Sequence, residues 1–96
     1  MKYESKFKSD EIDTLFEAIT SLETEEECYR FFEDICTIKE LQSMAQRLQV
    51  AIMLNNNVTY NEIETKTGAS TATISRINKC LNYGADGYKN ILEKLK

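Results

Sequence analysis

Apolar side chains recur every three or four residues along most of this chain, and that spacing constrains its fold more than any other feature. A first helix is predicted because Ile12, Leu15, Phe16, Ile19 and Leu22 share one helical face. The pattern returns in five further segments, and no apolar–polar alternation runs long enough to predict a strand. Proline is absent and glycine occurs only three times, so little interrupts a helix. We therefore expect an all-α fold of six helices.

Capping residues mark the boundaries of these helices. Three Thr-x-x-Glu sequences predict helix starts, because the threonine side chain accepts from a free amide and the glutamate bonds back: Thr24–Glu27, Thr37–Glu40 and Thr59–Glu62. The run Asn55–Asn57 predicts the end of the third helix, since asparagine tolerates the left-handed conformation common there. Gly84 and Asp86 predict a stop and a fresh start before the last helix.

The third helix is apolar on more than one face. Its predicted inward stripe consists of Leu41, Met44, Ala45, Leu48, Ala51 and Ile52, and the residues predicted to lie off that stripe are Val50, Met53 and Leu54. Such a helix is expected to be central or buried against a partner chain. Because 96 residues form one domain with a small core, we expect a homodimer.

The helical domain is expected to span residues 10–96, after a flexible arm at residues 1–9. The arm carries Lys2, Lys6 and Lys8, interleaved with Tyr3 and Phe7. These lysines either contact phosphate or belong to a frayed terminus, since the ends of protein chains are commonly poorly ordered.

Charge is distributed unevenly along the chain, whose net charge is −4. Residues 10–34 contain ten acidic side chains and a single basic one, Arg30. Residues 65–82 contain three basic side chains and no acidic one. The acidic part would be repelled by phosphate, whereas the second part could approach it.

Residues 59–82 have the spacing of a helix-turn-helix, which joins two helices through a short turn that often contains glycine. Gly68 falls in the turn, and Ser70 is a natural N-cap for the second helix. The positions expected to be buried between the helices are Ile63, Ile74, Ile77 and Leu81. Most side chains left facing outward are small, hydroxylated or basic, which suits a surface pressed against a duplex. The candidate DNA-contacting residues are Tyr60, Lys66, Ser70, Thr71, Ala72, Thr73, Ser75, Arg76 and Lys79.

Two functions are compatible with this pattern. The chain is either a regulator that binds double-stranded DNA or a helical protein–protein adaptor that docks through its acidic first helices. Glu64 counts against DNA binding, because it places an acid where such motifs usually carry alanine. Salt-sensitive binding to duplex DNA would separate the two, since an acidic adaptor should show none.

The run Thr67–Arg76 (TGASTATISR) resembles the recognition-helix signature of the Trp repressor superfamily. A longer pattern is still more similar to the Trp-repressor-like YerC/YecD proteins of that superfamily; it comprises Gln46–Ala51, Tyr60–Ile63 and Asn82–Gly84. The resemblance covers about residues 10–95. It implies a six-helix subunit, an interwoven homodimer and sequence-specific regulation of transcription, with repression the expected sense.

The same resemblance implies an effector site, because in the Trp repressor two arginines sandwich an indole and a serine helps bind the ligand amino group. Arg76 matches one arginine. Arg47 matches the other only if a one-residue shift lies near residues 55–57, and otherwise the position is Gln46.

Two replacements change this site: Ile77 stands where the family carries glycine, and Cys80 where it carries serine. An isoleucine beside the pocket would partly fill the space that an indole needs, so a different ligand, or none, is expected in place of tryptophan. The candidate effector-binding residues are Arg47, Arg76, Ile77 and Cys80.

Other chemistry has little support in the sequence. Cys28, Cys36 and Cys80 are an odd number with no close pair, and histidine is absent, so neither a zinc site nor a disulfide framework is expected. We expect reduced, buried thiols, with a redox role left open for Cys80. No enzyme activity, cofactor or metal is expected. No long apolar segment or signal core is present, so no membrane association and a cytoplasmic location are expected.

Overall fold

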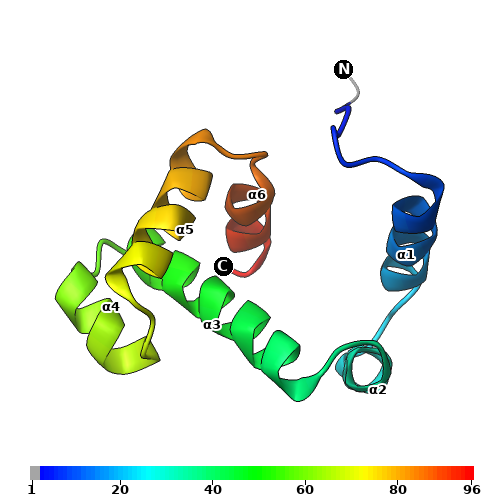
Figure 1. Cartoon of the computed structure of the whole chain (residues 1–96), viewed down its shortest axis with the longest axis horizontal. Helices are drawn as coiled ribbons and strands as arrows, with labels where there is room; N and C mark the ends of the chain where they lie inside the picture. The colour runs from blue at the N-terminus through cyan, green and yellow to red at the C-terminus, as the bar shows by residue number, and fades with distance from the viewer. Residues whose placement is uncertain (1–2) are drawn as a thin grey trace. The chain divides into compact units, whose positions relative to one another are not determined.

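The computed structural model describes residues 3–96, which form six helices and no strand (Figure 1). The helices are α1 (Asp10–Thr20), α2 (Glu25–Ile35), α3 (Ile38–Asn55), α4 (Tyr60–Thr67), α5 (Thr71–Tyr83) and α6 (Gly87–Lys94). The expected all-α, six-helix fold is confirmed. The chain divides into two compact units, an N-terminal unit that ends at Thr37 and a C-terminal unit, Ile38–Lys96.

The N-terminal unit consists of α1, α2 and the segment before them. Ser9 caps α1 by accepting from the Ile12 amide at 3.1 Å. Thr24 and Glu27 form the predicted capping box at the start of α2. Neither helix contains a buried residue, and the Phe16 side chain in α1 remains 55% exposed. The unit therefore has well-formed helix starts and no buried core of its own.

The segment before α1, predicted as a flexible arm, makes local contacts from residue 3 onward. The Lys8 ammonium pairs with the Asp13 carboxylate, and the Phe7 amide donates to Ser5 Oγ at 3.0 Å. The Lys6 ammonium lies 5.7 Å from the Phe7 ring centroid. Lys2, the third lysine of the predicted arm, lies outside the described residues.

The C-terminal unit contains the core, where α4, α5 and α6 pack against α3. The buried side chains are Val50, Ala51, Met53, Ile63, Ala69, Ile74, Ile77, Leu81 and Leu92. Burying aliphatic side chains away from water is the main favourable term in folding such a unit. The four positions predicted to be buried within the helix-turn-helix all belong to this core.

The predicted face of α3 is partly wrong. Val50 and Met53, expected off the inward stripe, are buried, while Met44 and Ala45, expected on it, are exposed. The buried residues of α3 all lie in its C-terminal part. The physical reason is that α4, α5 and α6 cover only the C-terminal part of α3. A stripe predicted along the whole helix therefore does not match the residues buried within a single chain.

The turns between helices follow the predicted chemistry. Asn57 takes a left-handed conformation (φ 61°) after α3, and Gly68 does so after α4 (φ 74°). Thr59 caps α4 by accepting from the Glu62 amide at 3.3 Å. Asp86 precedes α6 as expected but makes no side-chain cap hydrogen bond. No helix in the part of the chain that the structure describes is long and apolar enough to cross a membrane.

Candidate functional site

The segment from α4 to α5 is a helix-turn-helix held together by its isoleucines. Ile63 of α4 and Ile74 of α5 are fully buried, and Ile77 one turn later is 3% exposed. Gly68 ends α4 in the left-handed conformation, and its amide donates to the Glu64 carbonyl at 2.9 Å. A β-carbon makes that conformation unfavourable, which explains the glycine. The two helices therefore have a defined mutual geometry.

The turn is also fixed by side-chain hydrogen bonds. The Thr67 hydroxyl donates to the Ile63 carbonyl at 2.7 Å and accepts from the Ala69 amide at 3.1 Å. The Thr67 carbonyl in turn accepts from Gln46 Nε2 of α3 at 3.0 Å. A polar side chain of the central helix thus connects directly to the turn.

The N-terminal end of α5 is capped by Ser70, whose hydroxyl oxygen accepts from the Thr73 amide at 3.2 Å. The Ser70 hydroxyl donates to Thr73 Oγ1 at 3.1 Å. The Thr71 hydroxyl donates to the Glu64 carboxylate of α4. The first turn of α5 contains no acidic residue of its own.

Most candidate DNA-contacting residues lie on the exposed surface of this motif. The exposed ones are Lys66, Ser70, Thr71, Ala72, Ser75, Arg76 and Lys79. The other two are half-buried: Tyr60 packs against the hydrophobic core, and Thr73 lines a pocket on the α3-facing side of α5. The exposed set gives the α4–α5 motif a surface of small, hydroxylated and basic side chains.

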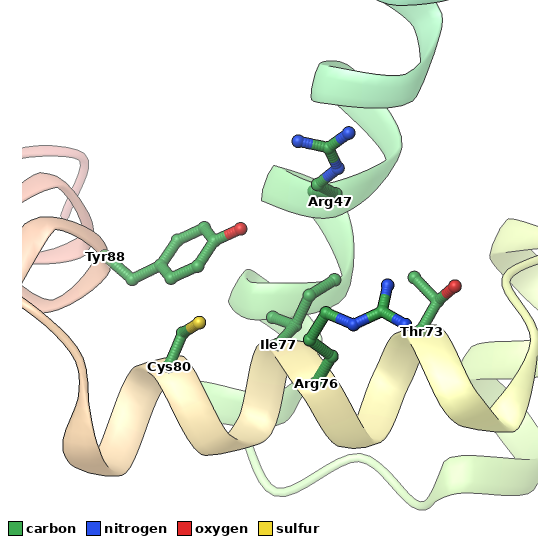
Figure 2. Close-up of a pocket in the computed structure, with 6 residues that line it drawn as sticks. All are labelled: Arg47, Thr73, Arg76, Ile77, Cys80 and Tyr88. Atoms are coloured by element: carbon green, nitrogen blue, oxygen red, sulfur yellow. The ribbon is translucent and has the colours of Figure 1, made fainter. Parts of the chain in front are cut away.

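The pocket has a volume of about 370 Å³ and is formed by three helices (Figure 2). The lining residues are Arg47 from α3, Thr73, Arg76, Ile77 and Cys80 from α5, and Tyr88 from α6. Figure 2 shows the Ile77 side chain pointing from α5 toward Arg47, with the Tyr88 hydroxyl directed into the same space. All four candidate effector-binding residues therefore lie together.

The sequence does not decide whether Arg47 or Gln46 takes the position of the second arginine in the pocket. The directions of the two side chains in the structure distinguish them. Arg47 lines the pocket, and its Nη2 donates to Ser43 Oγ at 3.2 Å. The Gln46 amide instead bonds to the Thr67 carbonyl. Arg47 and Arg76 thus line the same pocket.

Sequence reasoning missed Thr73 and Tyr88 as pocket residues. Tyr88 follows the apolar spacing of the last helix, and no local signal in the sequence shows that α6 brings it beside α5. Burial raises the pKa of the Tyr88 phenol, and the Cys80 thiol adds to that rise, whereas the Arg47 guanidinium acts in the opposite direction. The phenol is therefore neutral near pH 7 and available as a hydrogen-bond donor.

The family model described as Trp repressor protein matches residues 10–96 of this chain. The chain belongs to the Trp repressor family. It is 59% identical over 91 residues to the uncharacterised protein YerC of Bacillus subtilis strain 168, an alignment that covers 95% of this chain and 88% of YerC. The resemblance recognised in the sequence is confirmed.

Two solved structures share the fold. A TrpR-like protein from Eubacterium eligens superposes with a TM-score of 0.90 at 54% identity, covering 94% of this chain and 93% of that one. A structure from Staphylococcus aureus gives a TM-score of 0.89 at 51% identity, covering 94% and 90%. The six-helix Trp-repressor-like subunit is therefore an established property of the chain.

The cysteines of this family member differ from the expectation in one respect. Cys28 and Cys80 are exposed and Cys36 is half-buried, so none is the buried small side chain that was predicted. The physical reason for Cys28 is that α2 has no buried core to cover it. Cys80 lines the pocket between α3, α5 and α6 and stays exposed there. All three thiols are free. Within residues 3–96, no cluster of three His, Cys, Asp or Glu side chains could hold a metal ion.

Proposed function

We propose that this protein is a sequence-specific DNA-binding transcriptional regulator, with repression as its expected mode. The observation that carries the proposal is the rigid α4–α5 motif, whose second helix exposes small and basic side chains and has no acid in its first turn. Such a helix can enter the major groove, where its N-terminal residues reach base edges. Family membership supports the same function, which would place the protein in the cytoplasm with the chromosome.

We propose a homodimer as the active form. Support comes from apolar surface that a single chain leaves uncovered: α1 and α2 contain no buried residue, and Ile38 at the start of α3 is 66% exposed. Patches of this kind are typical of surfaces that bind a partner. A symmetric dimer would present two copies of α5, which suits half-sites about 34 Å apart along a duplex.

Salt dependence tests the proposal. Affinity for a duplex should fall steeply with salt, with a log–log slope of about −0.9 per phosphate neutralised. Replacing Arg76 and Lys79 with alanine removes up to four charges per dimer and should flatten the slope by as much as about 3.6. The matched control replaces Lys89 and Lys94 of α6, which are also exposed, and should keep the slope.

Fluorescence anisotropy with a labelled duplex provides the measurement. An equal slope for both double variants would mean that α5 is not the DNA-binding helix. Complete absence of salt-sensitive binding in the unmodified protein would favour the adaptor function instead. That alternative rests on the acidic first turns of α1 and α2.

We further propose that the three-helix pocket binds a small anionic effector and not L-tryptophan. Two guanidinium groups and the Tyr88 phenol supply donors suited to a carboxylate or phosphate. Ile77 stands where the family carries glycine and lines the pocket together with Arg47 and Arg76, so we expect its side chain to take up part of the space that an indole would need. Calorimetric titration with L-tryptophan should show no tight binding and no rise in DNA affinity. Micromolar binding that strengthens DNA binding would contradict this proposal.

A further inference from the structure

Glu64 is the one acidic side chain at the junction of α4 and α5. It is half-buried, and its carboxylate accepts a hydrogen bond from the hydroxyl of Thr71, the first residue of α5. Within residues 3–96, no lysine or arginine lies within ion-pair distance of Glu64. The carboxylate is therefore positioned by a neutral partner, and its charge is not neutralised by a neighbouring cation.

The position of this carboxylate matters because the N-terminal end of a recognition helix is the part that meets base edges. Backbone amides give that end a positive partial charge, which attracts an anion. The first turn of α5 has no acid, so Glu64 supplies a negative charge there from the neighbouring helix. The single bond to Thr71 uses one carboxylate oxygen and leaves the second without a hydrogen-bond partner among the described residues.

A carboxylate in the major groove has a defined preference. It accepts a hydrogen bond from the exocyclic amino group of cytosine, whereas the acceptors of guanine repel it. A carboxylate close to the sugar–phosphate backbone of DNA is repelled by the phosphates. It therefore lowers the affinity for any duplex that offers it no hydrogen-bond donor in compensation. A purely structural carboxylate at this position would show no preference for cytosine.

We propose that Glu64, held in place by Thr71, is a specificity-determining residue that reads a cytosine amino group in each half-site. The inference rests on the proposed DNA-binding function and adds to it the chemistry of one recognised base. It also explains why a DNA-binding motif would retain an acid where alanine is usual.

Selection from a random duplex library tests the proposal with the full-length protein. The unmodified protein should select one position at which cytosine is preferred by about 5- to 150-fold, the usual range for one specific contact. Glu64→Gln should change that preference from cytosine to adenine, because a glutamine amide pairs with adenine N6 and N7. Glu62→Gln, which removes the same charge from the exposed surface of the same helix, should keep cytosine.

Thr71→Val provides a second variant that keeps the carboxylate but removes the hydroxyl that orients it. The preference for cytosine should weaken, because the carboxylate is no longer held in one orientation. Unchanged base preferences in both the Glu64 and Thr71 variants would overturn the inference and leave the proposed function intact. If the unmodified protein binds no duplex at all, the proposed function fails first, and this inference fails with it.

Discussion

The two units of the molecule differ in how their apolar residues are used. The C-terminal unit buries nine residues between α3 and α6, including a fully buried isoleucine on each helix of the helix-turn-helix. The N-terminal unit has two capped helices of similar apolar spacing, yet buries none of their residues. The difference shows that amphipathic periodicity predicts a helix but not the surface that will cover it. A single chain supplies the core of the C-terminal unit. For the N-terminal unit we propose that a partner chain covers the apolar residues.

Replacing the central isoleucine of α5 should have the largest effect. Ile74 is fully buried, and Ile74→Ala should lower the free energy of unfolding by about 2–5 kcal/mol, because it removes buried methyl groups and leaves a cavity. Urea denaturation followed by circular dichroism measures this loss. A loss well below that range would mean that the C-terminal core is less tightly packed than the burial indicates.

A substitution of exposed Ile38 at the start of α3 tests whether a partner chain covers apolar surface that one chain leaves open. Ile38→Asp should not destabilise α3 in a single chain, because an acidic residue is favourable in the first turn of a helix. In a dimer whose interface covers this residue, the same substitution would bury an unpaired charge and weaken association. Sedimentation at low micromolar concentration should show twice the 11.1 kDa chain mass for the unmodified protein and a shift toward single chains for the variant. A folded monomer before any substitution would refute the dimer.

Sequence reasoning succeeded where the determinants are local. The caps at Ser70 and Thr24 and the left-handed turns at Asn57 and Gly68 depend on residues only a few positions apart. The buried positions of the helix-turn-helix were also predictable, because two short helices joined by a tight turn can meet in few ways.

The same reasoning failed where the outcome depends on segments distant in the chain. A helix that is apolar on more than one face, as α3 is, does not reveal which face its own chain covers, and the stripe predicted from spacing therefore omits Val50 and Met53. Local pattern could not show that α6 brings Tyr88 into the pocket. The choice between Arg47 and Gln46 required the side-chain directions that only the structure gives.

An intermediate effect is expected at the turn of the helix-turn-helix. Gly68 has φ 74°, and a β-carbon there would meet nothing within 4 Å, so any penalty comes from the backbone and not from a clash. Gly68→Val should therefore cost about 1–3 kcal/mol. Gly87→Ala is the control, because its added β-carbon is equally free of contacts and its φ is not left-handed.

The readout should separate the turn from the rest of the fold. The Gly68 variant should lose DNA binding under conditions where most helical circular dichroism survives, since the strain is confined to the α4–α5 turn. The Gly87 control should keep both properties. If the Gly68 variant were neutral for stability and for DNA binding, the recognition helix would have to be sought outside α5.

The smallest expected effect is a pH dependence that belongs to the C-terminal unit. The pKa of Tyr88 is raised in the folded chain above its ordinary value of 10.0, chiefly by burial and further by Cys80. The folded state therefore holds this proton more tightly than the unfolded state does. The stabilising contribution of this proton is complete below pH 10 and is lost as pH rises from there through the folded pKa.

The Tyr88→Phe variant cannot ionise at this position, so its unfolding free energy should fall less steeply above pH 10 than that of the unmodified protein. Tyr83→Phe is a matched control, because the Tyr83 side chain is 85% exposed and its removal should leave the steeper fall unchanged. Urea unfolding at a series of alkaline pH values gives the comparison, and parallel curves for the Tyr88 variant and the unmodified protein would show that α6 does not bury its tyrosine against α5.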